Sequence, residues 1–206
     1  MIRDAYLGTG AVVVELLRHP AVAAGWERPS ALPDLRVSGL AGHLSRGLTQ
    51  VEKITGEPPA TGVPIALLDN FWWLDQPRDH PDMVAVRDRG ETTASGGPSA
   101  LAETAAACLS RLRVTLPAEP PERVIELRDM WCLTLDDFLM TRLLELVVHL
   151  DDLAVSVDLP TPDVPAEASA AVIDLLARMA TARHGPYPVI RAFSRRERAP
   201  ETVAAF

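Results

Sequence analysis

Apolar residues recur at helical spacing in the first quarter of the chain. Across residues 2–18 they return every three or four positions, up to a stop near Pro20. Residues 36–56 carry a second stripe of this kind, made of Val37, Leu40, Leu44, Leu48 and Val51. A stripe at this spacing lies on one face of a helix and needs another element to cover it. Both segments are therefore predicted to be amphipathic helices that share a core.

Further helices are predicted wherever Ala, Leu and Val recur between prolines and glycines. They cover residues 64–75, 80–95, 98–116, 135–157 and 166–184. The longest follows Thr134, a residue type that favours helix N-caps. Between two of these helices the apolar pattern changes to an alternating one, which predicts two short strands within residues 123–135. The last segment, residues 187–206, is predicted to be a basic, partly helical tail.

This order of elements predicts a mainly α protein. Long helices joined by loops of moderate length favour a helix bundle, here with two short strands beside it. The chain has 206 residues, of which 48 % are hydrophobic, enough to bury a core of its own. We expect a bundle over residues 1–160 and a C-terminal helical extension over residues 161–206, packed on that bundle.

Charge and composition limit the classes of binding partner and the cellular compartment that we expect for this protein. The formal net charge of −8 argues against a general nucleic-acid or anionic-membrane binder. No apolar run reaches the roughly 18 residues that span a bilayer, and the start MIRDAYLGTG lacks the apolar stretch of a signal peptide. Two cysteines without a CxxC pair, Cys108 and Cys132, suit a reducing compartment and are interpreted as small core residues. We expect a cytoplasmic protein with no nucleic-acid or membrane partner.

The stretch LLELVVHL places Glu145 and His149 among apolar residues. A carboxylate is costly to bury without a partner, and burial alone should raise the pKa of Glu145. Residues four apart lie on one helix face, where they can chelate one metal ion or form an ordinary surface hydrogen bond. His43 lies in the apolar stripe beside Leu40 and Leu44, and metal sites in bundles are built from facing helices. The sequence therefore offers a candidate metal site of three residues.

Two aspartates follow His149 directly, Asp151 and Asp152. They are candidates for ligands or for hydrogen-bond partners of the ligands. Their ordinary role would be a solvated helix face, or ion pairs with Arg142 or Arg46. The sequence leaves these alternatives open.

Two segments together carry a family resemblance. RVSGLAGHLSRG, followed far downstream by TRLLELVVHLDDLAVSV, resembles the DinB-like metalloenzyme superfamily, and within it the mycothiol-dependent maleylpyruvate isomerase N-terminal domain family. The resemblance runs from the first helix to about Val157. It implies a DinB-like four-helix bundle with a metal at one end, held by His43, Glu145 and His149. Many DinB-like relatives have His at the position of Glu145, and the Glu form is similar to the maleylpyruvate isomerase branch.

The resemblance also implies an activity. In such proteins a divalent metal, expected to be zinc, binds a low-molecular-weight thiol such as mycothiol as its thiolate. Zinc deprotonates a coordinating thiol, and three protein ligands leave one position for it. The thiolate would add to a small electrophile, in either an isomerase or an S-transferase reaction.

One departure from the family concerns the substrate end. Maleylpyruvate isomerases of this type carry a distinct C-terminal domain, whereas here residues 158–206 read as one helix and an Arg-rich segment, RAFSRRER. That segment is either a solvated face, an anion clamp in which Arg191 or Arg195 reaches toward the metal, or a contact with a second subunit. The expected substrate is thus a small electrophile, with an anionic one and a homodimer left open.

Two other classes of function compete with the enzyme. The chain could bind metal and small molecules without turnover. It could also be a structural or stress-related interaction protein in which Glu145 and His149 are merely hydrogen-bonded. Metal content separates the last class from the others, and thiol-dependent turnover separates an enzyme from a binding protein.

Overall fold

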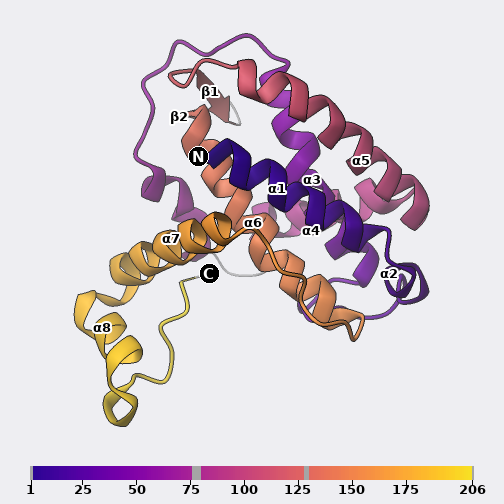
Figure 1. Cartoon of the computed structure of the whole chain (residues 1–206). Coiled ribbons are helices and arrows are strands. Elements are labelled where there is room, and N and C mark those ends of the chain that lie inside the picture. The colour runs from indigo at the N-terminus through magenta and orange to yellow at the C-terminus, as the bar shows by residue number, and fades with distance from the viewer. Residues whose placement is uncertain (1, 76–79, 128–129, 206) are drawn as a thin grey trace.

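The computed structural model describes residues 2–75, 80–127 and 130–205, and within them the chain is mainly α-helical (Figure 1). The described helices are α1 (Ile2–Leu17), α2 (Pro20–Ala24), α3 (Val37–Thr55), α4 (Pro81–Ala94), α5 (Gly97–Thr115), α6 (Leu135–Ser156), α7 (Ala166–His184) and α8 (Pro186–Ser194). The described residues also form three 3₁₀ segments, η1 (Leu67–Asp75), η2 (Leu116–Ala118) and η3 (Arg196–Arg198). The mainly α prediction is confirmed.

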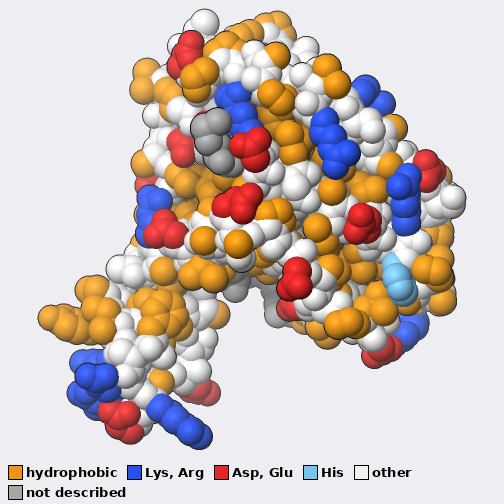
Figure 2. Space-filling view, viewed as in Figure 1, with side chains coloured by type: hydrophobic (Ala, Val, Ile, Leu, Met, Phe, Trp, Pro, Cys, Tyr) orange, Lys and Arg blue, Asp and Glu red, His pale blue; other side chains and the backbone are white. Residues whose placement is uncertain are grey.

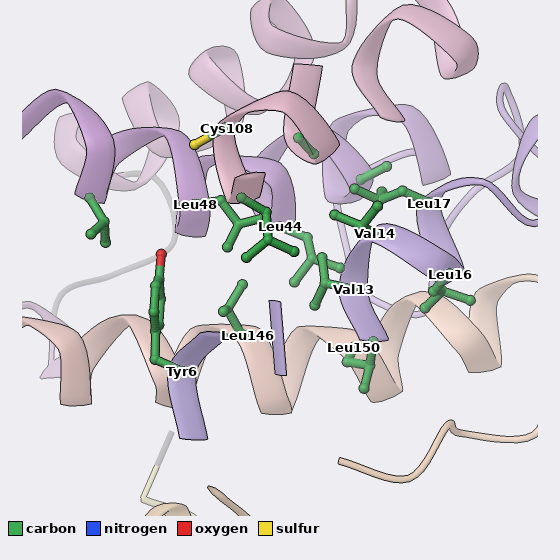
Figure 3. Close-up of a cluster of buried hydrophobic side chains, with 14 of the residues drawn as sticks. Tyr6, Val13, Val14, Leu16, Leu17, Leu44, Leu48, Cys108, Leu146 and Leu150 are labelled. Atoms are coloured by element: carbon green, nitrogen blue, oxygen red, sulfur yellow. The ribbon is translucent and has the colours of Figure 1, made fainter. Parts of the chain in front are cut away.

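Four helices, α1, α3, α5 and α6, pack on one another as a bundle. Their apolar faces meet in one cluster, in which Val13 of α1, Leu44 and Leu48 of α3 and Leu146 of α6 point toward a common centre (Figure 3). The fully buried Tyr6 donates its hydroxyl hydrogen to the carbonyl of Gly47 at 2.8 Å, so its polar end is satisfied inside the core. The stripes seen in the sequence are the faces that form this core.

Helix α4 lies directly against α3, and glycines make the approach possible. A Cβ on Gly42 would overlap the carbonyl oxygen of Gly90, and a Cβ on Gly90 would reach the carbonyl of Gly39. Only glycine lets two helix backbones come this close. A Cβ on Gly90 would also lie 3.5 Å from the Cβ of His43, so α4 passes α3 at the level of that histidine.

Two strands lead into α6. β1 (Val124–Leu127) pairs antiparallel with β2 (Trp131–Thr134), with Ile125 opposite Leu133. The hydroxyl of Thr134 then accepts a hydrogen bond from the amide of Asp137 at 3.1 Å and caps α6. The predicted strands and the predicted cap are confirmed.

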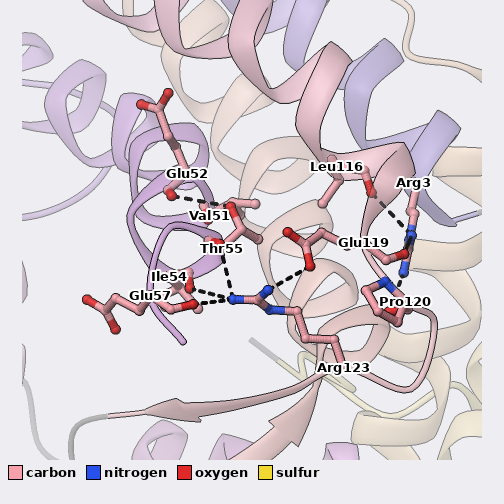
Figure 4. Close-up of polar contacts among 10 residues, drawn as sticks. All are labelled: Arg3, Val51, Glu52, Ile54, Thr55, Glu57, Leu116, Glu119, Pro120 and Arg123. Atoms are coloured by element: carbon pink, nitrogen blue, oxygen red, sulfur yellow. Dashed lines mark hydrogen bonds and ion pairs between the residues drawn. The ribbon is translucent and has the colours of Figure 1, made fainter. Parts of the chain in front are cut away.

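Two arginines close the ends of helices near these strands (Figure 4). The buried Arg123 pairs with Glu119 at 2.6 Å and donates to three carbonyls at the end of α3, those of Ile54, Thr55 and Glu57. Arg3 likewise donates to three carbonyls after α5, those of Leu116, Glu119 and Pro120. The last carbonyls of a helix have no partner within it, so these guanidinium groups fix both helix ends.

The structure corrects one predicted helix. Residues 64–75 do not form an α-helix from Pro64, because Pro64 bridges Cys132 and the amide of Ile65 donates to the Cys132 carbonyl at 2.9 Å. Regular structure begins only at Leu67 and is a 3₁₀ segment interrupted at Phe71. The backbone that the prediction assigned to the first turn of a helix is used instead for contact with a strand.

The C-terminal helices extend from the bundle. α7 packs on α6 and α1, and α8 packs on α7 and projects away from the bundle (Figure 1). Apolar side chains of α8 remain exposed next to arginines on this projection, as Figure 2 shows, among them Tyr187, Ile190 and Phe193. The domain boundary near residue 160 stays a prediction. Among the described residues, no helix has both the length and the apolar character needed to cross a membrane.

Candidate metal centre

The three candidate ligands come from two helices that cross inside the bundle. His43 lies on α3, and Glu145 and His149 lie one turn apart on α6. His43 contacts Glu145. Gln50, which lies further along α3, contacts Arg142, which precedes Glu145 on α6. The two helices therefore run antiparallel. Glu145 and His149 are each only 8 % exposed.

One carboxylate oxygen is the centre of the arrangement. Oε2 of Glu145 accepts a hydrogen bond from Nε2 of His43 at 2.9 Å and lies 3.1 Å from Nε2 of His149. The two imidazole rings meet edge to face, with centroids 4.9 Å apart. One ligating atom from each residue lies within 4.8 Å of the other two. The three residues singled out in the sequence thus share one small volume.

Asp152 orients His149 from behind. Its Oδ2 lies 2.8 Å from Nδ1 of His149, so Nδ1 carries a hydrogen and donates it. The other ring nitrogen, Nε2, is then the one that faces Glu145 and His43. A carboxylate on the far nitrogen of a histidine is the usual support of a metal-binding imidazole. Of the roles left open for Asp152, the structure places it as the partner of a candidate ligand.

The pKa of Glu145 is shifted in the direction opposite to the one expected from the sequence. Burial does favour the neutral acid, but hydrogen bonds from His149 and His43, with the nearby charges of His43 and Arg142, outweigh it. The pKa of Glu145 lies well below its ordinary value, so the net rise expected from burial does not occur. For His149, burial lowers the pKa, yet hydrogen bonds to Asp152 and Glu145 bring it up to about 9.

This donor set fits a divalent cation. Two imidazole nitrogens and one carboxylate oxygen are ligands that zinc and similar ions accept. The two Nε2 atoms lie 2.9 Å and 3.1 Å from Oε2 of Glu145, so hydrogen bonds hold the histidines to the carboxylate. A cation there would replace the protons as the positive charge beside a buried carboxylate. The fit thus rests on the convergence of the three groups on one point.

Arg142 is a neighbour of this centre that the sequence analysis placed elsewhere. The sequence offers Asp151 or Asp152 as its partner, but its Nη2 lies 3.9 Å from Oε1 of Glu145 and its guanidinium stacks on Phe138 at 5.5 Å. Asp151 instead accepts a hydrogen bond from Thr161. The i, i+3 spacing of Arg142 and Glu145 was the signal for their contact.

The other candidates lie apart from the centre. Arg191 stacks on Tyr187 at 6.0 Å, and Arg195 donates to the carbonyl of Ser194 at 2.7 Å, both at the projecting α8 (Figure 1). Their role as an anion clamp stays a prediction. Cys108 is buried in the core, and burial with the charge of Glu52 raises the pKa of its thiol to about 12, which makes it a poor nucleophile.

Comparison with known proteins identifies a family that the chain matches. No curated protein and no solved structure matches it. The family model described as the mycothiol maleylpyruvate isomerase N-terminal domain matches residues 10–154, a span that includes His43, Glu145 and His149. The match covers more than half of the chain, from α1 to the last turns of α6. The chain therefore belongs to the mycothiol maleylpyruvate isomerase N-terminal domain family.

Proposed function

We propose that this protein is a metal-dependent enzyme that uses a low-molecular-weight, mycothiol-like thiol to attack a small electrophile. The observation that carries the proposal is the single oxygen of Glu145 shared by His43 and His149, with Asp152 supporting His149. Membership of the mycothiol-related family supports a thiol as the cosubstrate. The site is buried in the bundle, where charged groups interact more strongly than in water.

His43, Glu145 and His149 would hold the metal, with zinc as the expected ion. Three protein ligands leave one position for a cosubstrate, as in other catalytic zinc sites. When bound, the divalent cation would supply the charge that stabilises the thiolate form of the thiol at neutral pH.

The surrounding residues of the chain prepare the three ligands. Asp152 holds the hydrogen of His149 on Nδ1 and so leaves Nε2 free to act as a ligand. Arg142 stands on the Oε1 side of Glu145, which keeps Oε2 turned toward the histidines. The residues that follow two of the ligands in the chain, Leu44 after His43 and Leu146 after Glu145, are buried in the core of the bundle. The ligands are thus held by contacts that do not require the metal.

The proposed chemistry is the formation of a sulfur–carbon bond. In an isomerase, the sulfur lone pair attacks a conjugated carbon, the former double bond rotates as a single bond, and expulsion of the same thiolate restores the double bond. In an S-transferase, the sulfur displaces a halide or opens an epoxide, and the conjugate is released. Both reactions need the thiolate and an electrophile in one site.

Metal content is the first test. The protein is purified without a histidine tag, loaded with zinc, dialysed and measured by mass spectrometry. We expect about one zinc per chain in the wild type and in His184→Ala, whose imidazole bonds the Ala204 carbonyl instead. His149→Ala should lose the metal. Equal, negligible zinc in wild type and His149→Ala would overturn the proposal.

Thiol binding is the second test. In the cobalt-substituted protein, mycothiol or 2-mercaptoethanol should produce a thiolate-to-cobalt charge-transfer band, whereas ethylene glycol, which has no sulfur, should not. Thiol-dependent turnover of a generic electrophile then separates an enzyme from a binding protein. No spectral change at saturating thiol would rule out the metal as the thiol site.

A further inference from the structure

Helix α8 presents a stripe of apolar side chains to solvent. Tyr187, Ile190 and Phe193 are 68 %, 54 % and 70 % exposed. Residues three apart are neighbours on a helix surface, so these three side chains form one continuous stripe. Val189 is the buried residue of α8, and it packs in a cluster with residues of α7. Large apolar side chains that gather in an exposed patch mark an interaction surface.

The part of the chain that carries this stripe is fixed at both ends. We call residues 166–205, which comprise α7, α8, η3 and the returning chain, the C-terminal arm. α7 packs on α6 and α1, and Nε2 of His184 donates to the carbonyl of Ala204 at 2.9 Å. Ala205 is buried in the same cluster as α7. The apolar stripe is therefore held in place before any partner binds, which lowers the entropy cost of binding.

Charge is divided along the C-terminal arm. On α7, the acidic Glu167 and Asp174 lie in the first half, and the basic Arg178 and Arg183 lie in the second half. The segment from α8 to η3 then adds four arginines, Arg191, Arg195, Arg196 and Arg198. Figure 2 shows blue side chains beside orange ones at this projecting end. Residues 186–206 hold four arginines and two glutamates, a net charge of +2, and the whole chain carries −8, so residues 1–185 carry −10.

The basic side chains of the arm have few acidic partners within the described chain. Arg191 stacks on Tyr187, and Arg195 donates to a backbone carbonyl. Arg196 makes no hydrogen bond or ion pair to any residue that the structure describes. These guanidinium groups are therefore available to a partner that brings acidic groups.

The first half of α7 offers the complementary surface. Glu167 and Asp174 are exposed and pair with no residue in the described ranges. Ile173, which is 62 % exposed, lies beside Asp174 on the same helix. This face combines an apolar side chain with acidic ones, whereas α8 combines apolar side chains with basic ones. One chain thus carries both halves of a complementary pair.

We propose that the C-terminal arm is a homodimerisation device. The apolar and basic face of α8 docks on the acidic first half of α7 in a second copy of this chain, and the second copy docks in the same way in return. The acidic half of α7 lies toward the bundle and α8 projects away from it (Figure 1), so one copy cannot close the pair on itself. A two-fold axis pairs each end of the arm with the opposite end of its partner. The opposite charges fix this orientation and exclude the parallel one.

The first test is the mass of the protein as its concentration rises. Sedimentation equilibrium is measured from about 1 to about 200 μM, a range that suits a small and reversible interface. We expect the wild type to change from monomer to dimer. Ile190→Ser combined with Phe193→Ser should weaken the dimer about tenfold or more. Val114→Ser is the matched control, because Val114 is 76 % exposed on α5, and it should leave the dimer unchanged.

The second test exchanges charges between the two surfaces. One variant carries Glu in place of Arg191, Arg195 and Arg196, and the other carries Arg in place of Glu167 and Asp174. Each variant alone should be monomeric, because its two surfaces have the same sign of charge. An equimolar mixture should form a heterodimer, because both contacts then join opposite charges. High salt should weaken the wild-type dimer and the heterodimer alike. Circular dichroism melts establish that each variant is folded.

Three results would overturn the proposal. The first is a wild type that stays monomeric at the highest concentration. The second is a dimer that tolerates the α8 substitutions, or charge variants that do not associate when mixed. The third is binding of monomeric wild type to phosphatidylglycerol vesicles that is lost with Ile190→Ser and Phe193→Ser, which would assign the α8 face to a membrane surface. These measurements need no metal, so they stand whether or not the proposed thiol chemistry is found.

Discussion

At the scale of single residues, Glu145 is held as an anion by its neighbours. His43, His149 and Arg142 face it from α3 and α6, and Asp152 stands on the far side of His149. Burial alone would have kept the acid neutral. Sequence reasoning could weigh burial but not the full set of contacts, because the contact with His43 depends on how α3 packs on α6. The sign of the pKa shift is therefore a property of the assembled bundle.

The metal-free protein should show the pH dependence that these groups dictate. The pKa of Glu145 is depressed, so its contribution to stability is present above the unfolded value of about 4.3 and is lost as pH falls. The pKa of His149 is raised to about 9, so its contribution is present below the unfolded value of about 6.5 and is lost as pH rises to about 9. Thermal melts of chelated protein from pH 4 to 9 should therefore peak between these two unfolded values.

The control for this pH profile is the metal-free His149→Gln variant. It keeps a hydrogen-bonding side chain but cannot be charged, so the decline above about pH 6.5 should be weaker than in the wild type. A wild-type Tm that climbs steadily from pH 6.5 to 9, or an identical decline in the variant, would contradict the assignment to His149.

Asp152 should increase zinc affinity by orienting His149, and not through its own charge alone. Asp152→Asn keeps the shape but weakens the acceptor for Nδ1 of His149, so zinc affinity should fall about 10- to 100-fold. Affinity is measured by competition with a chelating dye. Asp151→Asn is the matched control, because Asp151 accepts from Thr161 and should leave zinc affinity within about twofold. An equal loss of zinc affinity in both variants would show that the effect comes from a general loss of negative charge.

At the scale of elements, the helices with a clear apolar stripe were predictable, and the helix that was wrongly predicted was changed by a contact distant in sequence. Pro64 was expected to begin a helix, but it bridges Cys132 of the strand β2. The predicted stop of the first helix near Pro20 is confirmed, because α1 ends at Leu17, but Pro20 also begins the short helix α2, where Nδ1 of His19 accepts from the amide of Ala21. A proline suits both a helix start and the position after a helix end, and only the surrounding fold decides between them.

The contact between α3 and α4 should be intolerant of a single methyl group. A Cβ on Gly42 would overlap the backbone of Gly90, which cannot move as a side chain can. Gly42→Ala should therefore destabilise the fold by about 1–3 kcal/mol, measured by urea unfolding. Gly56→Ala is the control, since Gly56 has a right-handed conformation and its nearest atom to a new Cβ is 3.3 Å away. That variant should be neutral or slightly more stable. An unchanged stability of Gly42→Ala would show that α4 can shift without loss.

At the scale of the whole molecule, the site is assembled from segments that the sequence keeps apart. The spacing of Glu145 and His149 is local and could be recognised, and His43 was found through its apolar stripe and the family resemblance. His43 and Glu145 are 102 positions apart, and α4 reaches the level of His43 only because glycines let it lie on α3. Helical periodicity describes the faces of elements but not the pairing of those faces. The approach of α4 to His43 therefore had no signal in the sequence.

The same assembly predicts that the metal serves function more than folding. The buried cluster of the bundle draws apolar side chains from α1, α3, α5 and α6, and each fully buried Leu or Val contributes about 1.5–3 kcal/mol before the entropy of folding is subtracted. The candidate ligands are also bonded to one another without a metal. Chelated protein should thus remain helical and melt cooperatively above 25 °C at pH 7, as followed by circular dichroism.

Zinc at about 100 times its dissociation constant should then add about 2.7 kcal/mol to the free energy of unfolding. His43→Ala should lose that gain while remaining folded. A chelated wild type that is unfolded at 25 °C would make the metal structural, and the case for an open position that accepts a thiol would fall with it.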